Sequence, residues 1–130
     1  MGISFKPDNR KRVLYVEDDR DSREAVGMFL DDMGFQVTET DNLQDAERIG
    51  RELFDVYIVD GTFPRVPAGQ AVRGIGIELY DRIHRIYGKI NYAILSLDDD
   101  LEDACKARGI VFIGKSRPGN GLLEYLKGLQ

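Results

Sequence analysis

The chain has 130 residues, which suits one domain with a single hydrophobic core. Its hydrophobic content of 42% excludes a disordered composition, and its net charge of -5 without an evident basic face argues against nucleic acid as a direct partner. The single cysteine, Cys105, excludes an internal disulfide framework, and no apolar run approaches the roughly 20 residues of a membrane helix. We therefore expect a cytoplasmic protein that does not enter a membrane.

The first ten residues are polar and predict a loose N-terminal arm, and residues 11–130 predict one domain. Apolar runs rich in β-branched residues predict buried strands, while one run alternates as a half-exposed edge strand does. The five strands are expected at residues 13–16, 35–39, 54–60, 92–95 and 110–113.

Five helical patterns alternate with these strands. We expect the first helix to begin with a capping box at Asp21 and Glu24, and the second to be capped by Asp41 with Leu53 on its apolar face. The acidic run 98–100 is expected to open the fourth helix, because acidic residues favour the positive end of the helix dipole. The alternative is that this run extends a metal site.

Buried strands that alternate with helices predict a doubly wound α/β sheet with helices on both faces. The expected order of its five parallel strands is 2-1-3-4-5, the flavodoxin-like arrangement. One segment departs from the alternation, because residues 61–76 contain Pro64, Pro67 and several glycines. These residues predict a long loop.

Charged and hydroxyl side chains that could bind a ligand or take part in a reaction follow several of the predicted strands. The first strand is followed by Glu17 and Asp18, the third ends at Asp60, and the fourth and fifth lead to Ser96 and Lys115. Because the carboxyl ends of parallel strands share one edge of the sheet, we expect these side chains to meet there. Three neighbouring carboxylates repel one another and recruit a proton or a hard cation such as Mg²⁺. A cation, a lysine and a hydroxyl suit a phosphoryl group, which an aspartate can accept as an acyl phosphate.

Several short segments together resemble the receiver domains of bacterial two-component response regulators over roughly residues 11–129. Segment 13–19 is similar to the family's first strand with its acidic pair, and segment 57–60 is similar to its phosphoacceptor strand. The other similar segments are Pro64, Gly76-Ile77-Glu78-Leu79, Ile94-Leu95-Ser96 and Phe112-Ile113-Gly114-Lys115.

The resemblance implies that Asp60 accepts a phosphoryl group from a sensor histidine kinase or a histidine phosphotransfer protein. It also implies that Mg²⁺ is held by Asp18, Asp60 and the backbone carbonyl of Thr62, with Glu17 holding a coordinating water. Self-catalysed transfer and loss of the phosphoryl group are the only chemistry expected. The chain is therefore expected to be a signalling domain and not an enzyme.

The resemblance further implies a switch. Ser96 is expected to hydrogen-bond a phosphoryl oxygen while Lys115 pairs with the phosphate. Movement of Ser96 would let Phe112 turn inward and change a face that binds a downstream protein target. Because the sequence ends with the last helix, we expect a single-domain receiver, with a homodimer as a further expectation from the family.

The chain departs from the family's pattern beside the expected site. An insert lies between Pro64 and Gly76, and its Arg65 and Arg73 could contact a partner or a phosphoryl group if the insert is more than a mobile surface loop. Leu97 stands where the family prefers a small residue and could narrow access to the acceptor.

Three further positions also differ. Ser116 replaces the family's proline after the lysine, which removes the usual reason for a cis peptide there. Thr62 and Asp98 occupy two positions that tune the lifetime of the phosphate in the family, in a direction that the sequence leaves open.

Two other functions stay open. A phosphorylation-independent docking scaffold of the same fold is favoured by the insert, Leu97 and Ser116 and opposed by the intact acidic set. A Mg²⁺ phosphohydrolase would use Asp60 as its nucleophile, but such enzymes want a second acid just after the nucleophile, and Gly61 and Thr62 offer none.

Overall fold

The computed structural model describes residues 9–115 and 121–129. Five parallel strands form one sheet in the order β2-β1-β3-β6-β7, which confirms the predicted 2-1-3-4-5 order of a flavodoxin-like sheet. Most of the predicted N-terminal arm and the peptide bond before Ser116 lie outside the described residues. The strands of the sheet are β1 (Arg12–Val16), β2 (Gln36–Thr40), β3 (Val56–Asp60), β6 (Tyr92–Ser96) and β7 (Val111–Gly114).

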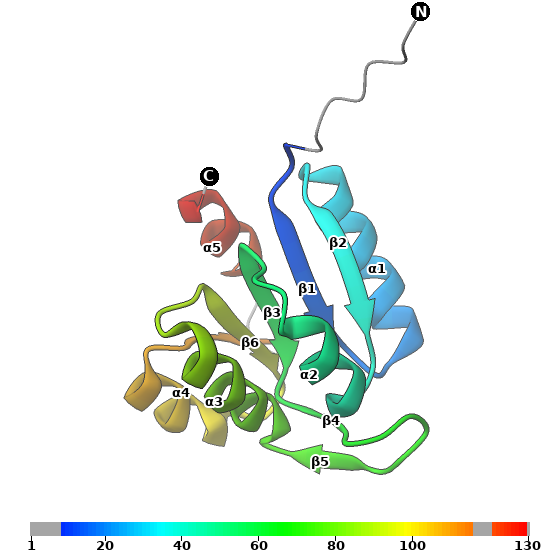
Figure 1. Cartoon of the computed structure of the whole chain (residues 1–130), viewed down its shortest axis with the longest axis vertical. Helices are drawn as coiled ribbons and strands as arrows, with labels where there is room; N and C mark the ends of the chain where they lie inside the picture. Colours follow the sequence, from blue (N-terminus) through cyan, green and yellow to red (C-terminus); the bar gives the residue numbers. More distant parts are fainter. Residues whose placement is uncertain (1–8, 116–120, 130) are drawn as a thin grey trace, which may run out of the picture.

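Helices cover both faces of this sheet (Figure 1). Helices α1 and α5 pack on one face around Tyr15, Leu30 and Leu126, and α2, α3 and α4 pack on the other around Leu79 and Cys105. None of the helices in the described ranges is both long and apolar enough to cross a membrane. The helices are α1 (Arg20–Asp32), α2 (Leu43–Gly50), α3 (Ile75–Tyr87), the 3-10 turn η1 (Asp99–Leu101), α4 (Glu102–Arg108) and α5 (Gly121–Leu129).

Strand β3 is the centre of the sheet and is buried along its whole length. Tyr57 and Val59 pack toward α2, α3 and α4, whereas Val56 and Ile58 pack toward α1 and α5. Burying such an aliphatic side chain contributes about 1.5–3 kcal/mol, so both faces hold the strand in register. Asp60, the last residue of β3, is therefore presented from a fixed backbone.

Two glycines let other segments approach the end of β3 closely. A Cβ on Gly76, in the first turn of α3, would clash with the carbonyl oxygen of Asp60. A Cβ on Gly61 would lie 2.7 Å from Leu101 Cδ1 and 3.0 Å from Ser96 Oγ. A side chain at Gly76 is excluded by the backbone, whereas one at Gly61 would require the Leu101 side chain to shift; α3 and β6 consequently pack directly against the end of β3.

Helix α1 begins earlier than the sequence predicted. Its cap is Asp19, whose Oδ2 accepts a hydrogen bond of 2.9 Å from the amide of Ser22. The predicted capping box at Asp21 and Glu24 is therefore wrong, and Glu24 instead pairs with Arg20 at 3.1 Å. Several acidic residues in a row offer competing caps, and the sequence alone does not choose between them.

Helix α2 is capped by Asn42 and not by Asp41. The Oδ1 atom of Asn42 accepts a hydrogen bond of 2.9 Å from the amide of Asp45. The helix ends at Gly50, so Leu53, which was predicted on its apolar face, lies beyond it and is 56% exposed.

The segment predicted as a long loop, residues 61–76, contains a β-hairpin. Strands β4 (Thr62–Pro64) and β5 (Ala71–Arg73) pair antiparallel, with Thr62 opposite Arg73. Figure 1 places the hairpin at the edge of the main sheet to which the arrowheads of β1 and β3 point. The insert therefore forms part of a regular β-hairpin that lies beside the end of β3.

Candidate functional site

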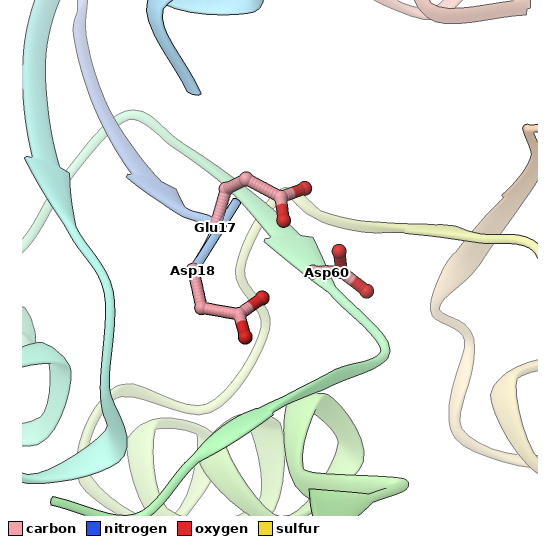
Figure 2. Close-up of side chains that lie close together, drawn as sticks. All are labelled: Glu17, Asp18 and Asp60. Atoms are coloured by element: carbon pink, nitrogen blue, oxygen red, sulfur yellow. The ribbon is translucent and has the colours of Figure 1, made fainter. Parts of the chain in front are cut away.

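Three carboxylates meet where β1 and β3 end (Figure 2). Glu17 and Asp18 follow β1 and Asp60 ends β3, and one oxygen of each lies within 4.8 Å of the others. The side chain of Glu17 is 2% exposed and that of Asp60 is 12% exposed, while Asp18 lies open to solvent. The structure brings together the three acids that the sequence placed at this edge.

Lys115, directly after β7, supplies a positive charge to two of these acids. Its Nζ atom donates hydrogen bonds to Asp60 Oδ2 at 2.9 Å and to Glu17 Oε2 at 3.0 Å. Burial lowers the pKa of Lys115, but its hydrogen bonds to Asp60 and Glu17 outweigh burial and the net effect raises the pKa. Because the site has three carboxylates and one ammonium group, its net charge is negative, and it can bind a further cation.

The carboxyl group of Glu17 is strongly perturbed by its surroundings. Burial, with the neighbouring Asp60 carboxylate adding to it, raises the pKa of Glu17 to about 7, although the hydrogen bond from Lys115 opposes this. The backbone of Glu17 is also fixed, because its amide donates to Thr40 O at 3.0 Å and its carbonyl accepts from Arg23 Nη1 at 2.9 Å. Burial of a carboxyl group is energetically unfavourable, and a buried acid with a fixed backbone is typical of a ligand-binding site.

Two residues near the acids were missed from the sequence. Arg23 of α1 holds the carbonyl of Glu17, and Tyr15 of β1 places its hydroxyl in a buried position without a hydrogen-bond partner among the described residues. Burial and then the charges of Glu17 and Asp60 raise the pKa of Tyr15 above its ordinary range. The position of Tyr15 could have been predicted from the sequence. Successive side chains of a strand point to opposite faces, so Tyr15, two residues before Glu17, lies on the same face as Glu17.

Ser96, at the end of β6, lies against the end of β3. It is 3% exposed, and its Oγ accepts a hydrogen bond of 3.0 Å from the amide of Asp98. Its carbonyl accepts from the amide of Lys115 at 2.8 Å, which ties the ends of β6 and β7 together. The Ser96 hydroxyl and the Lys115 backbone are thereby fixed relative to each other.

The remaining predicted site residues lie at the same edge or next to it. The amide of Thr62 donates to Asp60 Oδ1 at 3.0 Å, while the part of its carbonyl in metal binding stays a prediction. Phe112 of β7 is half-buried against the core beneath α2, α3 and α4. Its movement as a switch also stays a prediction.

The acidic run 98–100 was predicted to open the fourth helix; in the structure it caps the 3-10 turn η1, which leads directly into α4. The carboxylate of Asp98 accepts from the amide of Asp100 at 3.1 Å, at the start of η1. Within residues 9–115 and 121–129, the carboxylate cluster suited to a metal consists of Glu17, Asp18 and Asp60, so it does not include this run.

Both arginines of the insert form ion pairs. Arg65 donates to both carboxylate oxygens of Glu78 on α3, at 2.7 Å and 2.9 Å. Arg73 contacts Asp98 through Nε and, at 3.1 Å, through Nη2, which also lies 3.4 Å from Asp100 Oδ2. Leu97, between Ser96 and Asp98, is 71% exposed.

The sequence pattern of the response regulator receiver domain matches residues 13–126, which include every residue of the acidic cluster and Lys115. The chain belongs to the response regulator receiver domain family. A search of the curated proteins finds no sequence match.

Solved structures share the fold of this receiver domain. The non-phosphorylated HemR receiver domain from Leptospira biflexa is 22% identical with a TM-score of 0.75, over 92% of this chain and 94% of that one. The response regulator TrrA from Thermotoga maritima, in complex with Mg²⁺-BeF, is 20% identical with a TM-score of 0.74, over 92% of this chain and 99% of that one. The receiver domain of a Pseudomonas aeruginosa sensor histidine kinase, with a magnesium ion in its active site cleft, is 19% identical with a TM-score of 0.69, over 93% of this chain and 95% of that one.

Proposed function

We propose that this receiver domain is a phosphorylation switch in which Asp60 accepts a phosphoryl group from a phosphohistidine of a sensor histidine kinase or histidine phosphotransfer protein. The observation that carries the proposal is the position of Asp60, which lies 2.9 Å from Lys115 Nζ and within 4.8 Å of the oxygens of Glu17 and Asp18. In the transfer, an oxygen of Asp60 bonds to phosphorus as the bond from phosphorus to the histidine nitrogen breaks.

The oxygen donors of the site fit Mg²⁺, which prefers carboxylates and carbonyls with several waters. Asp18, Asp60 and the carbonyl of Thr62 would hold the ion, and Glu17 would hold one of its waters. When bound, Mg²⁺ supplies charge neutralisation at the phosphoryl oxygens. The exposed Asp18 and the deeply buried Glu17 suit these two different roles.

The other residues of the site each have a separate task. Lys115, already 2.9 Å from Asp60, would pair with the phosphoryl group, and the Ser96 hydroxyl would donate a hydrogen bond to one of its oxygens. The consequent shift of Ser96 and Phe112 would alter the face made by α4, β7 and α5, which binds a downstream protein or a second copy of the chain. This reading makes the chain a signalling domain without a further enzymatic activity.

One structural feature favours a second candidate function, a docking scaffold that works without phosphorylation. The hairpin β4–β5 is anchored by Arg65 to α3 and by Arg73 to Asp98, so it forms a defined surface beside the acceptor. Such a surface could bind a partner whether or not Asp60 is modified.

Intact-mass spectrometry distinguishes the two functions. The chain is incubated with acetyl phosphate and, separately, with a phosphorylated histidine phosphotransfer domain, each with and without Mg²⁺. We expect one phosphate adduct that requires Mg²⁺ and is absent from Asp60→Asn. The absence of an adduct with both donors would reject the switch in favour of the scaffold.

A further inference from the structure

The insert contacts the segment that follows Ser96. Arg73 ends β5, and its guanidinium binds the carboxylate of Asp98, with Nη2 at 3.1 Å from Oδ1. This is a two-point contact between a planar guanidinium and a carboxylate, which fixes direction as well as distance. The two residues are 25 positions apart in the sequence, so the hairpin brings a charge to a segment that it does not adjoin along the chain.

Asp98 in turn contacts the hydroxyl of Ser96. Its amide donates to Ser96 Oγ at 3.0 Å, while its carboxylate is held by Arg73 and by the amide of Asp100. A hydroxyl whose oxygen accepts an amide proton keeps its own proton for another acceptor. The geometry therefore leaves Ser96 as a hydrogen-bond donor.

The Ser96 hydroxyl lies over the residue that follows the acceptor. A Cβ on Gly61 would be 3.0 Å from Ser96 Oγ, so the hydroxyl occupies the space beside the end of β3. On the other side of this point, Thr62 donates its amide to Asp60 Oδ1 at 3.0 Å and pairs with Arg73 across the hairpin. The first residue of the hairpin, Thr62, thus contacts Asp60, and its last residue, Arg73, contacts Asp98 in the segment after Ser96.

The second arginine of the hairpin provides a comparison within the same element. Arg65 carries the same charge and has a similarly exposed side chain, but it binds Glu78 on α3. Any effect of the hairpin's general charge or stability applies to both arginines, whereas only Arg73 binds Asp98.

We propose that Arg73 is a positioning residue for phosphoryl binding: it fixes Asp98, and through the Asp98 amide it keeps the Ser96 hydroxyl over Gly61 with its proton directed to a phosphoryl oxygen. This inference rests on the proposed function of Asp60 and Ser96. It gives the insert a role: the hairpin, through Arg73, influences how tightly the site binds the phosphoryl group.

The first test needs neither metal nor phosphate. Amide hydrogen exchange is measured by NMR on the wild-type chain, Arg73→Ala, Arg73→Lys and the matched control Arg65→Ala. We expect the Asp98 amide to exchange several-fold faster in Arg73→Ala, with partial recovery in Arg73→Lys and no change in Arg65→Ala. Equal exchange of the Asp98 amide in the wild-type chain and Arg73→Ala would overturn the proposal.

The second test measures affinity for beryllofluoride, a phosphoryl mimic, by calorimetry at saturating Mg²⁺. Because exposed ion pairs are weak, we expect Arg73→Ala to bind about two- to fivefold more weakly than Arg65→Ala. In a Ser96→Ala background the Arg73→Ala change should have no further effect, since no hydroxyl remains to be positioned. An equal loss in both backgrounds would assign Arg73 a general structural role and overturn the inference.

The same measurements distinguish a failure of the proposed function from a failure of the role proposed for Arg73. A wild-type chain that fails to bind beryllofluoride would reject the proposed function, and the inference with it. A wild-type chain that binds while Arg73→Ala matches Arg65→Ala would reject the inference alone. Arg73→Lys retains the charge and serves as the test if Arg73→Ala does not fold.

Discussion

Lys115 Nζ lies 2.9 Å from Asp60 Oδ2, although the two residues are 55 positions apart in the sequence. The same ammonium lies 3.0 Å from Glu17 Oε2, so it compensates two buried acids at once. Among the described residues, Lys115 is the basic side chain that forms an ion pair with each of these carboxylates. The side chain of Lys115 therefore connects the carboxyl ends of three strands, β1, β3 and β7.

Replacing that side chain should lower stability. We expect Lys115→Met to reduce the free energy of unfolding by about 1–3 kcal/mol, because two buried acids lose their partner and one must take up a proton. Urea denaturation measures this, with the exposed Lys127→Met as the control. Added Mg²⁺ should restore part of the loss, and an unchanged unfolding midpoint would show that the ion pairs contribute nothing to stability.

The close packing of α3 against the end of β3 can be tested at Gly76. A Cβ there meets the Asp60 carbonyl oxygen, so Gly76→Ala should destabilise the fold by about 1–3 kcal/mol through overpacking. Gly128, on α5, has open space around its Cβ position. Gly128→Ala should therefore be neutral or stabilising by roughly 0.5–1 kcal/mol, because alanine favours a helix more than glycine. Similar urea midpoints for the two variants would contradict the packing described for Gly76.

Metal binding should depend on the exposed acid of the site. We expect Asp18→Asn to weaken Mg²⁺ binding on the order of tenfold, because one of the charged oxygen ligands is lost. Calorimetric titration of the unphosphorylated chain measures this directly. Asp21→Asn removes the same charge from the first turn of α1, outside the cluster, and should leave the affinity unchanged.

The buried thiol gives a pH-dependent prediction. Burial raises the pKa of Cys105 to about 11, from an ordinary value of 9.0. The unfolded thiol therefore loses its proton first, so stability should fall as the pH rises from about 9 toward 11. Cys105→Ala should show a smaller fall over this range, which denaturation at several pH values measures.

The same thiol should also report on unfolding. Cys105 is fully buried and its thiol stays protonated at pH 8, so it should react with a disulfide reagent only in urea. Rapid reaction of the native chain would mean that α4 opens readily from the sheet.

The positions of the site residues could be predicted because each follows an apolar run. Asp60 and Ser96 each end a strand that is buried throughout, and Lys115 follows another, so the parallel sheet alone brings them to one edge. The strand order and the family followed from the same segments. The side-chain contacts between them, such as Lys115 with Glu17, required the structure.

Other features had no adequate signal in the sequence. The hairpin strands are three residues each, too short for a periodic pattern, and Pro64 and Pro67 suggested a loop. The contact of Arg73 with Asp98 depends on how the hairpin folds back, which local sequence does not encode. The cap at Asp19 was misplaced because Asp21 offered an equally good local pattern.

The hairpin has one more consequence, for engineering. Its two strands are joined by residues 65–70, and apart from Arg65, which binds Glu78 on α3, this tip can be changed while Thr62 and Arg73 keep their pairing. Ala68 in this tip has a φ of 59°, a conformation that glycine or asparagine adopts more easily. A fluorophore attached to an exposed tip residue such as Gln70 would lie on the same hairpin as Thr62, whose amide donates to Asp60 Oδ1, so its emission would test whether the hairpin responds to changes at Asp60.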